Sequence, residues 1–336
     1  PYSDKSLIRN ALIYDLSNKI GQYATRTRFF EMKLNGDFLG TYLLMEKIKR
    51  DKNRVDIEKL ESNDNDPNVI SGGYIIKIDK TTGESSSHGD YNEKISFYSK
   101  YDPNGEKGKD KKIYFLYDVP SPKNISKEQK IYIQSYINSF EDALLSNDFL
   151  DSKTGYRQFI DVNSFVDFFL LNELSHNPDA YRLSTYMHKN RNGKLKMGPI
   201  WDFNIAFGNV NYCKGENVDN WIFKYNDYCP DDFWLVPFWW SKLLKDPYFT
   251  NQVKSRWQEL RENELSDKVI FGKIDLLISE LESSSSIKTN FERWPILDQW
   301  IWPNSYVGTT YQSEISYLKT WLSQRLTWMD SNIPSL

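Results

Sequence analysis

Apolar residues recur at helical spacing near the start of the chain and then give way to alternating, β-rich runs. Over residues 6–21, leucine, isoleucine and alanine fall at intervals of three and four, which predicts an amphipathic helix that stops at Gly21. Two β-rich runs come next, over 28–34 and 38–46, on either side of Asn35-Gly36. Asn-Gly favours the tight turns that join two-stranded hairpins, so a hairpin is expected here.

The middle of the chain predicts further strands, separated by a polar segment. We expect strands over 72–79, 94–98, 113–117, 181–189 and 194–200. A short helical turn is predicted over 56–60. Residues 80–112 are rich in Ser, Gly, Asp and Lys, which indicates a long, mobile insertion that holds one or two of these strands.

Helical patterns dominate the later part of the chain. Ser126 is a suitable N-cap before an apolar stripe over 131–145, and a second, more apolar helix is predicted over 161–174. From Pro237 onward the pattern is mostly helical and ends in a helix over 314–328. A β-rich front and a helix-rich back predict the α+β class rather than alternating βαβ units. We place the division near residue 120, with a β-rich region over 1–120 and a helical region over 121–336.

Composition narrows the classes of function. Aromatic residues make up 15% of the chain, enough for a large core, although exposed aromatics would instead suggest sugar stacking. The formal charge of −3 argues against a nucleic-acid partner, which needs an excess of positive charge. No apolar run is long enough to span a membrane. The chain begins at Pro1 without an initiator Met, so we expect an N-terminal segment to be missing.

The two cysteines, Cys213 and Cys229, allow one disulfide in an oxidising compartment. Two unpaired thiols fit the sequence equally well. A structural zinc site is excluded, because two cysteines without a nearby histidine supply too few ligands.

Two aspartates carry the most informative chemistry. Asp179 comes after the helix predicted over 161–174, and Asp202 after the strand pair predicted over 181–189 and 194–200. The hairpin between them returns the chain toward its start, so we expect the two carboxylates to lie close together. Phosphoryl transfer uses such a pair, one carboxylate to accept the proton of the attacking hydroxyl and another to hold the metal on the nucleotide.

A structural role competes with this interpretation. An aspartate after proline, as at Asp179, is often a turn or cap residue, and Asp202 is equally suited to capping the segment after it. For either residue alone the structural role is the better explanation. Both together, with Trp201 and Gly208 nearby, favour function.

Three segments resemble the CotH family of atypical protein kinases. Its signature NG-x-(Y/F)-x-G-x-Y-x-x-x-E is similar to Asn35-Gly36, Phe38-Leu39-Gly40-Thr41-Tyr42 and Glu46. Its PWD-x-D…FG box is similar to Ile200-Trp201-Asp202-Phe203-Asn204 and Phe207-Gly208. Its C-terminal region is similar to Arg256-Trp257, Arg293-Trp294 and the helix over 321–328. The resemblance runs from about residue 4 to residue 333.

The resemblance implies an atypical protein-kinase-like fold, with a β-rich N-terminal lobe and a helix-rich C-terminal lobe. It also implies that the protein uses ATP with Mg²⁺ or Mn²⁺ and phosphorylates Ser or Thr of secreted, surface or spore-coat proteins, as a bacterial secreted or surface protein itself. By the family pattern Asp179 is the catalytic aspartate and Asp202 a metal ligand, with Asn204 at the second acid position of the box. Lys77 is the candidate for holding phosphate oxygens, and Glu46 its candidate ion-pair partner. Lys47 competes for the lysine role, and a solvent-facing strand position explains Lys77 as well.

The chain departs from the family pattern at two metal-binding positions. Ser184 stands five residues after Asp179, where kinases carry a metal-binding Asn, and Asn204 replaces an acid. A hydroxyl and an amide are weaker ligands than a carboxylate for a hard cation. These changes predict one metal where two are usual, and they favour two alternatives, a pseudokinase or a non-catalytic binding module on the same scaffold. A carbohydrate-active enzyme is a third option, which rests on aromatics and scattered carboxylates alone.

Several other residues have structural explanations. His176 precedes Asp179 at a spacing that differs from the kinase His-x-Asp turn, and we expect it to pack or cap. His88 and His188 have no companion suited to metal binding. The cluster of Trp234, Phe238, Trp239 and Trp240 is expected to be core, with an exposed docking surface as the minority interpretation.

Overall fold

Five antiparallel strands form the main sheet of the described residues, in the order β4-β5-β3-β6-β7. The computed structural model describes residues 2–82 and 89–336. The strands are β3 (Tyr74–Ile78), β4 (Ser96–Tyr98), β5 (Tyr114–Val119), β6 (Thr185–Lys189) and β7 (Leu195–Met197). All five lie where the sequence predicts a strand, within a few residues at their ends.

The sheet crosses the division predicted near residue 120. β3 lies at its centre and pairs with β5 on one edge and with β6 on the other. β6 and β7 come from the later part of the chain, yet they complete the sheet that the earlier strands begin. The β-rich and helix-rich parts therefore share one sheet, because the buried backbone of β3 needs hydrogen-bond partners on both edges. A mixed α+β protein is confirmed, with 38% helix and 14% strand.

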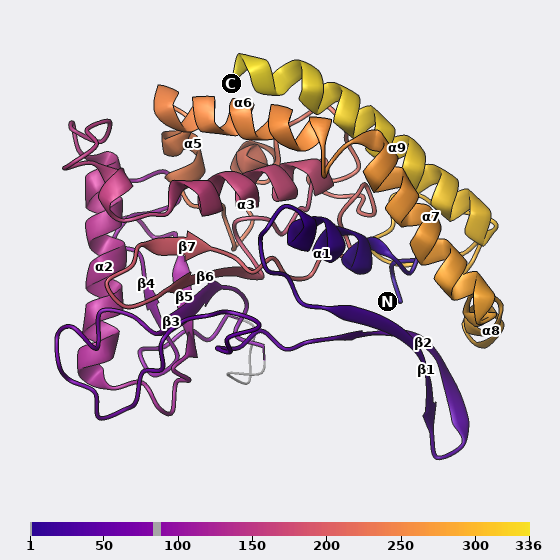
Figure 1. Ribbon diagram of the computed structural model, residues 1–336, viewed down its shortest axis with the longest axis horizontal. Helices are drawn as coiled ribbons and strands as arrows, with labels where there is room; N and C mark the ends of the chain where they lie inside the picture. Colours follow the sequence, from indigo (N-terminus) through magenta and orange to yellow (C-terminus); the bar gives the residue numbers. More distant parts are fainter. Residues whose placement is uncertain (1, 83–88) are drawn as a thin grey trace.

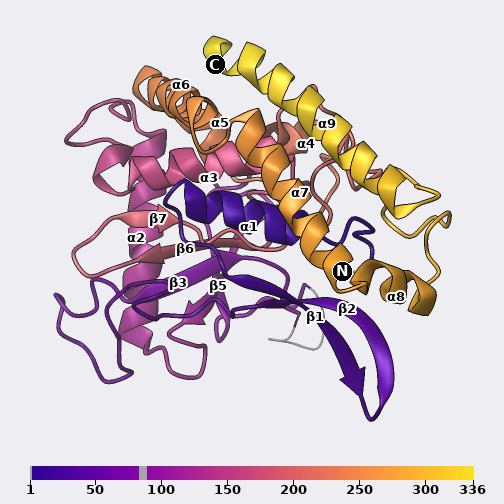
Figure 2. The ribbon, with the colours of Figure 1, turned by 45° about the vertical axis from the view of Figure 1, so that its right-hand side comes forward.

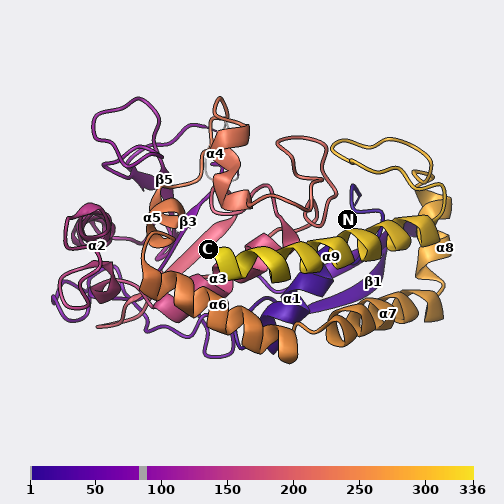
Figure 3. The ribbon, with the colours of Figure 1, turned by 90° about the horizontal axis from the view of Figure 1, so that it is seen from above.

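Helices cover the sheet and extend beyond it (Figure 1). They are α1 (Arg9–Lys19), α2 (Lys127–Leu145), α3 (Val162–Ser175), α4 (Tyr225–Tyr228), α5 (Trp239–Leu243), α6 (Pro247–Glu262), α7 (Asp267–Ser283), α8 (Ser286–Arg293) and α9 (Tyr311–Asn332). Short 3₁₀ turns are η1 (Tyr156–Gln158), η2 (Ile222–Lys224) and η3 (Ile333–Ser335). α3 contacts β7, α6 and α9, so it lies between the sheet and the C-terminal helices (Figures 1 and 3).

α3 is the most deeply buried helix of the described part of the fold. Apart from Asn163 in its first turn, its residues are almost all buried, as the apolar run in the sequence predicts. α1 packs against α3 and α7, and Ile8, Leu12 and Leu16 on its apolar stripe are fully buried. These two helices form the frame on which the loops of the site are built.

The hairpin predicted around Asn35-Gly36 is confirmed. β1 (Thr27–Leu34) pairs with β2 (Asp37–Met45) as a separate two-stranded sheet that projects from the body (Figure 2). α8 packs against β2, and the Trp294 indole donates a hydrogen bond to the carbonyl oxygen of Leu39, at 2.8 Å. Gly40 has φ +112°, and a Cβ there would stand 2.8 Å from Trp294 Nε1. The position therefore requires glycine, for both its backbone conformation and its close packing.

Two further predictions concern residues 56–60 and the polar segment over 80–112. The short helical turn over 56–60 is wrong, because this segment is extended and buries Ile57 in a small cluster with Ile75 and Tyr186. In the polar segment, the described residues from 89 onward include β4, and Ser99 is buried where its hydroxyl donates to Glu141. The mobility of this segment stays a prediction.

The aromatic cluster after residue 233 is core, as expected. Phe238, Trp239 and Trp240 are buried, and Trp239 and Trp240 pack against Phe140 and Phe168 on the helices beneath. Trp234 differs, since it is only partly buried. Across residues 2–82 and 89–336, no helix is both long and apolar enough to cross a lipid bilayer.

Candidate functional site

Asp179 lies in a tight loop that begins where α3 ends. His176 closes α3 in the left-handed conformation, with φ 46°, and its ring is buried with Nδ1 3.2 Å from the carbonyl oxygen of Gly215. It caps and packs, as predicted from its spacing. The backbone NH of Asp179 donates to Asn177 Oδ1, at 3.2 Å, and the NH of Leu183 donates to the Asp179 carbonyl, at 2.9 Å. These bonds fix the loop and leave the Asp179 side chain 18% exposed.

A buried ion pair anchors this loop from below. Glu173, on the last turn of α3, accepts a hydrogen bond from the Tyr181 hydroxyl, at 3.1 Å, and pairs with Arg325 of α9, at 3.2 Å. The Arg325 Nε also donates to the Glu173 carbonyl oxygen, at 2.9 Å. Burial raises the pKa of Glu173, and the Arg325 guanidinium opposes that rise. Because Tyr181 lies two residues after Asp179, this network ties the loop to the C-terminal helix.

Asp202 lies in a second loop, held by α1. Its backbone NH donates to the Tyr14 hydroxyl, at 2.8 Å, and the NH of Phe203 donates to Asn10 Oδ1, at 2.6 Å. Further on, the carbonyl oxygen of Ala206 accepts from Arg9 Nε, at 3.0 Å. The helix thus holds the backbone of this loop at and after Asp202, whose side chain stays exposed.

The two loops are bonded to each other. The NH of Phe207 donates to the carbonyl oxygen of Ser175, at 2.7 Å, and Asn177 Nδ2 reaches the carbonyl oxygen of Asp202, at 3.5 Å. The prediction that the hairpin returns Asp202 toward Asp179 agrees with these contacts.

Five charged side chains lie within electrostatic reach of one another at this place. Although Asp202 is accessible at the surface, the protein packed around its carboxylate raises its pKa to about 6, and the charges of Asp179 and Asp79 add to that rise. Burial likewise raises the pKa of Asp179, against the opposing effects of Arg182 and Lys80. Asp79 and Lys80, at the end of β3, therefore belong to the same cluster as the two predicted aspartates.

Backbone strain is concentrated in the same two loops. Tyr181, Ser184, Asp202 and Phe207 all have positive φ, between 46° and 68°. Residues with side chains avoid this region, and such outliers persist where surrounding contacts hold them, often at functional sites. Gly208 comes next with φ +70°, and a Cβ there would stand 2.4 Å from Trp321 Cδ1.

The predicted lysine lies near the cluster, with a different partner from the one expected. Lys77 stands on β3 opposite Tyr186, with its amine 5.6 Å from the ring centroid and 3.5 Å from Asp79 Oδ2. Glu46 is bound instead by Arg26, whose Nε donates to it at 2.8 Å, and by Arg54, at 3.4 Å. These arginines, Arg26 foremost, lower the pKa of Glu46 to about 2. The expected Lys77–Glu46 ion pair is therefore wrong, because two arginines already neutralise Glu46.

Arg182 completes the site, and the sequence analysis misses it. It is almost fully buried, and it donates to Asp179 Oδ1 at 2.9 Å and to Asp232 Oδ2 at 3.3 Å. Its guanidinium stacks on Tyr225, 4.0 Å from the ring centroid. Its position three residues after Asp179, on the same turn, is the signal that sequence analysis could have used.

A disulfide supports the segment that carries Tyr225 and Asp232. Cys213 and Cys229 are bonded, which settles the alternative that the sequence left open. The Tyr225 hydroxyl donates to Asp232 Oδ2, at 2.7 Å. The disulfide therefore constrains the segment that contains Tyr225, on which the Arg182 guanidinium stacks. Because Arg182 donates to Asp179, this constraint also helps to hold Asp179 in place.

The two departures from the family pattern have different surroundings. Asn204 Nδ2 lies 3.4 Å from Ser3 Oγ, so its amide faces the start of the chain. Ser184 takes a left-handed conformation, with φ 46°, just before β6. Among residues 2–82 and 89–336, no three His, Cys, Asp or Glu side chains gather closely enough to hold a metal ion. His188 donates to the Gly198 carbonyl in the sheet, and His88 lies outside the described residues.

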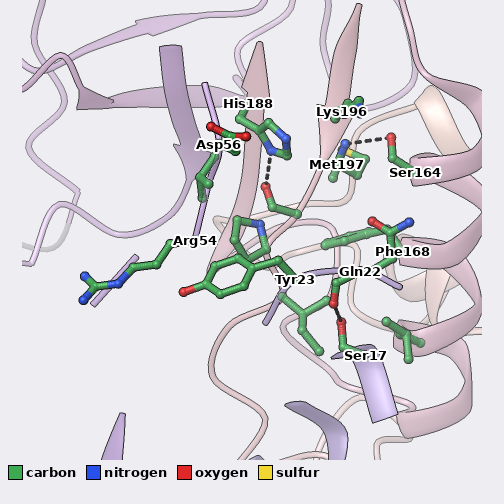
Figure 4. A pocket seen from close by; sticks show the side chains of 15 residues that line it. Ser17, Gln22, Tyr23, Arg54, Asp56, Ser164, Phe168, His188, Lys196 and Met197 are labelled. Atoms are coloured by element: carbon green, nitrogen blue, oxygen red, sulfur yellow. Dashed lines mark hydrogen bonds between the residues drawn. The ribbon is translucent and has the colours of Figure 1, made fainter. Parts of the chain in front are cut away.

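A small cavity lies behind the Asp202 loop rather than at the aspartates. Tyr23, Arg54, His188 and Pro199 are among the residues that line it (Figure 4), and its volume is about 120 Å³. Pockets for ligands of drug size hold about 300–1,000 Å³. This cavity is therefore too small for a ligand of nucleotide size.

The fold is of the mixed α+β class, and two of its loops bring Asp179 and Asp202 within electrostatic reach of each other. The family model described as CotH kinase protein matches residues 1–329, nearly the whole chain. The chain belongs to the CotH kinase family, as the three resembling segments predict. No curated protein matches the chain.

Proposed function

We propose that the protein is an ATP- and metal-dependent phosphotransferase that phosphorylates Ser or Thr of secreted or surface proteins. The observation that carries this proposal is the bonding of the Asp179 and Asp202 loops to each other, which holds two carboxylates within electrostatic reach. Family membership supports kinase-like chemistry, and the disulfide fits an extracellular protein.

The residues present fit a nucleotide-bound divalent metal. Asp79, Asp179 and Asp202 lie within electrostatic reach of one another, although within the described residues no three acids are close enough to share a cation. Within the described residues, Asp179 is paired with Arg182 and Asp79 with Lys77, each at less than 4 Å. The exposed Asp202 carboxylate is the one that would bind a cation. Mg²⁺ on nucleotides typically takes one or two carboxylates, with phosphate oxygens and water completing its shell, so a three-acid cage is not required. The bound ion would neutralise phosphate charge.

Asp179 is the proposed base. Phosphoryl transfer forms a bond between the substrate hydroxyl oxygen and the γ-phosphorus, releases ADP, and moves the hydroxyl proton to a carboxylate. Burial raises the pKa of Asp179 above that of a free aspartate, which makes it a better proton acceptor. Arg182 orients the carboxylate through its bond to Oδ1.

Lys77 is the proposed phosphate-binding residue, and Asp79 rather than Glu46 orients it. The Lys77 side chain is 13% exposed and lies opposite Tyr186 of β6, the strand next to β3. The proposal assigns Asn204 no more than a weak, secondary contact to the metal, because its amide bonds to Ser3.

A pseudokinase is the second candidate function. It is favoured by the ion pair between Arg182 and Asp179, which occupies one oxygen of the base, and by the neutral side chains at Ser184 and Asn204. Such a protein would bind ATP and metal without transferring phosphate.

Label transfer and thermal stability separate the candidates. Purified protein is incubated with γ-labelled ATP, Mg²⁺ or Mn²⁺ and a Ser-rich acceptor, alongside Asp202→Asn, Asp179→Asn and Asp148→Asn. Asp148 is an exposed carboxylate in the turn after α2 and serves as the matched control. We expect transfer in the wild type and in Asp148→Asn. Asp179→Asn should lose roughly a hundredfold or more, because it removes the proton acceptor. Asp202→Asn should lose transfer because it removes the carboxylate for the cation. Equal label in the wild type and Asp202→Asn would overturn the kinase proposal.

The thermal readout is independent of turnover. ATP with metal at a hundred times its Kd stabilises a protein by about 2.7 kcal/mol. A shift in the wild type without transfer would establish the pseudokinase. If ATP causes no shift in melting temperature at any metal concentration, both the kinase and the pseudokinase are excluded. A non-catalytic binding module then remains.

A further inference from the structure

Whereas the small cavity lies at the β6–β7 edge of the sheet, a larger groove lies at the β4–β5 edge. It runs between the edge formed by β4 and β5 and the first half of α2, and its volume is about 860 Å³. In Figure 1, α2 stands beside this edge of the sheet. Volumes of about 300–1,000 Å³ are typical of ligand sites, so the groove is large enough for several residues of a peptide.

Stacked tyrosines form one wall of the groove. The rings of Tyr91 and Tyr114 stack with centroids 4.1 Å apart, and Tyr98 meets Tyr114 edge to face at 6.2 Å. Tyr98 is 51% exposed although it is an aromatic residue on the sheet. Because Tyr98 lies on β4, the edge strand of the sheet, its exposed ring stands where an extended chain would dock.

Lysines form the rim. Lys100, Lys127 and Lys130 line the groove, and the Lys112 amine lies 5.3 Å from the ring centroid of Tyr98. The amine of Lys130 is held by the carbonyl oxygens of Glu93 and Lys94, at 2.9 and 3.0 Å, rather than by a carboxylate. Lys100 is paired with Asp142, but Lys127 is exposed at the first position of α2. Glu93 also lines the groove and offsets one of these charges, so the rim keeps a small excess of positive charge.

The tyrosine wall leads to the aspartate cluster. The Tyr91 hydroxyl donates to the carbonyl oxygen of Asp79, at 2.7 Å, and accepts from Trp234 Nε1, at 2.7 Å. The amine of Lys80 lies 5.1 Å from the ring centroid of Trp234. Asp79 and Lys80 both belong to the cluster around Asp179 and Asp202. This explains why Trp234, unlike the rest of its aromatic cluster, is not core.

We infer that this groove binds an acidic, extended segment of the protein substrate and so delivers its Ser or Thr to the aspartate site. The inference rests on the proposed function, because that function supplies the reason for a protein substrate. The lysine rim selects acidic side chains by charge, and the tyrosine wall and the edge strand favour an extended backbone. A neutral sugar would use the tyrosines but would leave the lysines without a role.

Binding is measured first, without ATP. A fluorescent peptide with one Ser among Asp and Glu residues is titrated with the protein, and anisotropy gives Kd. A peptide with Lys in place of the acids serves as the charge control. We expect the acidic peptide alone to bind, and Lys127→Glu to weaken it about fivefold, since a partly exposed charge pair contributes up to about 1 kcal/mol. Tyr98→Ala should weaken it as well.

Lys268→Glu is the matched control variant. Lys268, like Lys127, is exposed in the first turn of a long helix, in this case α7, on the opposite side of the molecule in Figure 1. Both substitutions add the same charge change at a helix N-terminus, so both proteins should fold, which circular dichroism verifies. Lys268→Glu should bind the acidic peptide as the wild type does.

The kinetic arm separates failure of the groove from failure of the proposed function. With transfer from ATP, the inference predicts that Lys127→Glu raises KM for the acidic peptide about fivefold and leaves kcat unchanged. Peptide binding that Lys127→Glu weakens, in a protein that transfers no phosphate, would support the groove and refute the kinase. Unchanged KM and Kd in Lys127→Glu and Tyr98→Ala would overturn the groove while the kinase stands. Displacement of the peptide by ATP or by a neutral oligosaccharide would also overturn the groove proposal. Equal affinity for the acidic and the basic peptide would overturn it as well.

Discussion

Removing the Arg325 guanidinium tests whether the buried ion pair beneath the Asp179 loop holds the fold together. In Arg325→Met, an apolar side chain of similar length replaces a cation that is fully buried. The variant loses the pairing with Glu173 and also the bonds from Nη1 to the carbonyl oxygens of Val218 and Asn220, at 2.8 and 2.7 Å. Breaking a buried pair by removing one partner costs about 3–5 kcal/mol, because the other charge stays buried.

The expected change in melting temperature depends on the length of the chain. Unfolding entropy is about 2.1 cal/mol/K per residue, which gives roughly 0.7 kcal/mol/K for 336 residues. A loss of about 3–5 kcal/mol then lowers Tm by about 4–7 °C. Among the described residues, Tyr181 and the backbone of Ile222 and Phe223 still donate to Glu173, so we expect the lower half of this range.

The sign of the pH dependence gives a second readout. Burial raises the pKa of Glu173, and without Arg325 that rise is no longer opposed. The folded state then binds a proton that the unfolded state has released, so stability falls as the pH rises above the unfolded value. Arg325→Met should therefore lose less stability at about pH 5 than at about pH 8. The double variant Glu173→Gln/Arg325→Met should be more stable than the two single losses predict.

Scanning calorimetry at both pH values measures all of these variants, with Arg293→Met as the control. Arg293 forms an exposed ion pair with Asp37, at 3.4 Å, and its loss should cost at most about 1 kcal/mol. A Tm for Arg325→Met within about 1 °C of the wild type would refute the reasoning. So would additive losses in the double variant.

Two further predictions concern packing and protonation. Gly208→Ala should destabilise the protein by about 2–4 kcal/mol, as Cm in urea measures, because the new methyl group meets Trp321 as well as an unfavourable φ. Gly36→Ala is the control, because Gly36 has φ +87° but nothing within 4 Å of an added Cβ. It measures the cost of the unfavourable backbone conformation alone. Equal losses of stability in the two variants would contradict a contribution from the Trp321 contact. Burial raises the pKa of Glu141 to about 7, although Ser99 and Trp239 donate hydrogen bonds to its carboxylate. The folded state therefore keeps a proton on Glu141 that the unfolded state releases. The free energy of unfolding should then fall by up to about 3 kcal/mol as the pH rises from about 4.5 to 7. Glu141→Gln should flatten that slope in urea unfolding at about pH 5 and 8, and an unchanged slope would assign it to another group.

Periodicity predicts the elements well because each depends on residues close in sequence. The helix at the start, the hairpin, the central strand and the apolar helix over 161–174 all have a strong local pattern, and their ends differ by only a few residues from those observed. The turn over 56–60 fails because burial of Ile57 against Ile75 is a tertiary contact. For a similar reason the pattern does not reveal that the main sheet extends across residue 120, since β3 (Tyr74–Ile78) pairs with the distant β6 (Thr185–Lys189).

The candidate site is predictable in part. The places of Asp179 and Asp202, after a helix and a strand, single them out, but spacing across the chain does not reveal ion-pair partners. Analogy with kinases pairs Glu46 with Lys77, whereas Arg26 stands beside Glu46 across the hairpin. Asp79, two residues after Lys77, has a usable signal, because alternate residues of a strand point to the same side.

The structure also explains why the family resemblance extends over nearly the whole chain rather than over the aspartate loops alone. Gly40 of the hairpin and Gly208 of the second loop are both closed against tryptophans from the C-terminal region, Trp294 and Trp321. α9 supplies Trp321 and Arg325, so one helix packs against the Asp202 loop and holds the helix that leads to Asp179. The loops that carry Asp179 and Asp202 contain residues in the left-handed conformation, which is unfavourable in isolation. Contacts from distant parts of the chain are therefore needed to hold these residues. The geometry of the two carboxylates is therefore a property of the complete fold, and a motif search confined to the central loops would miss the contacts that hold them in place.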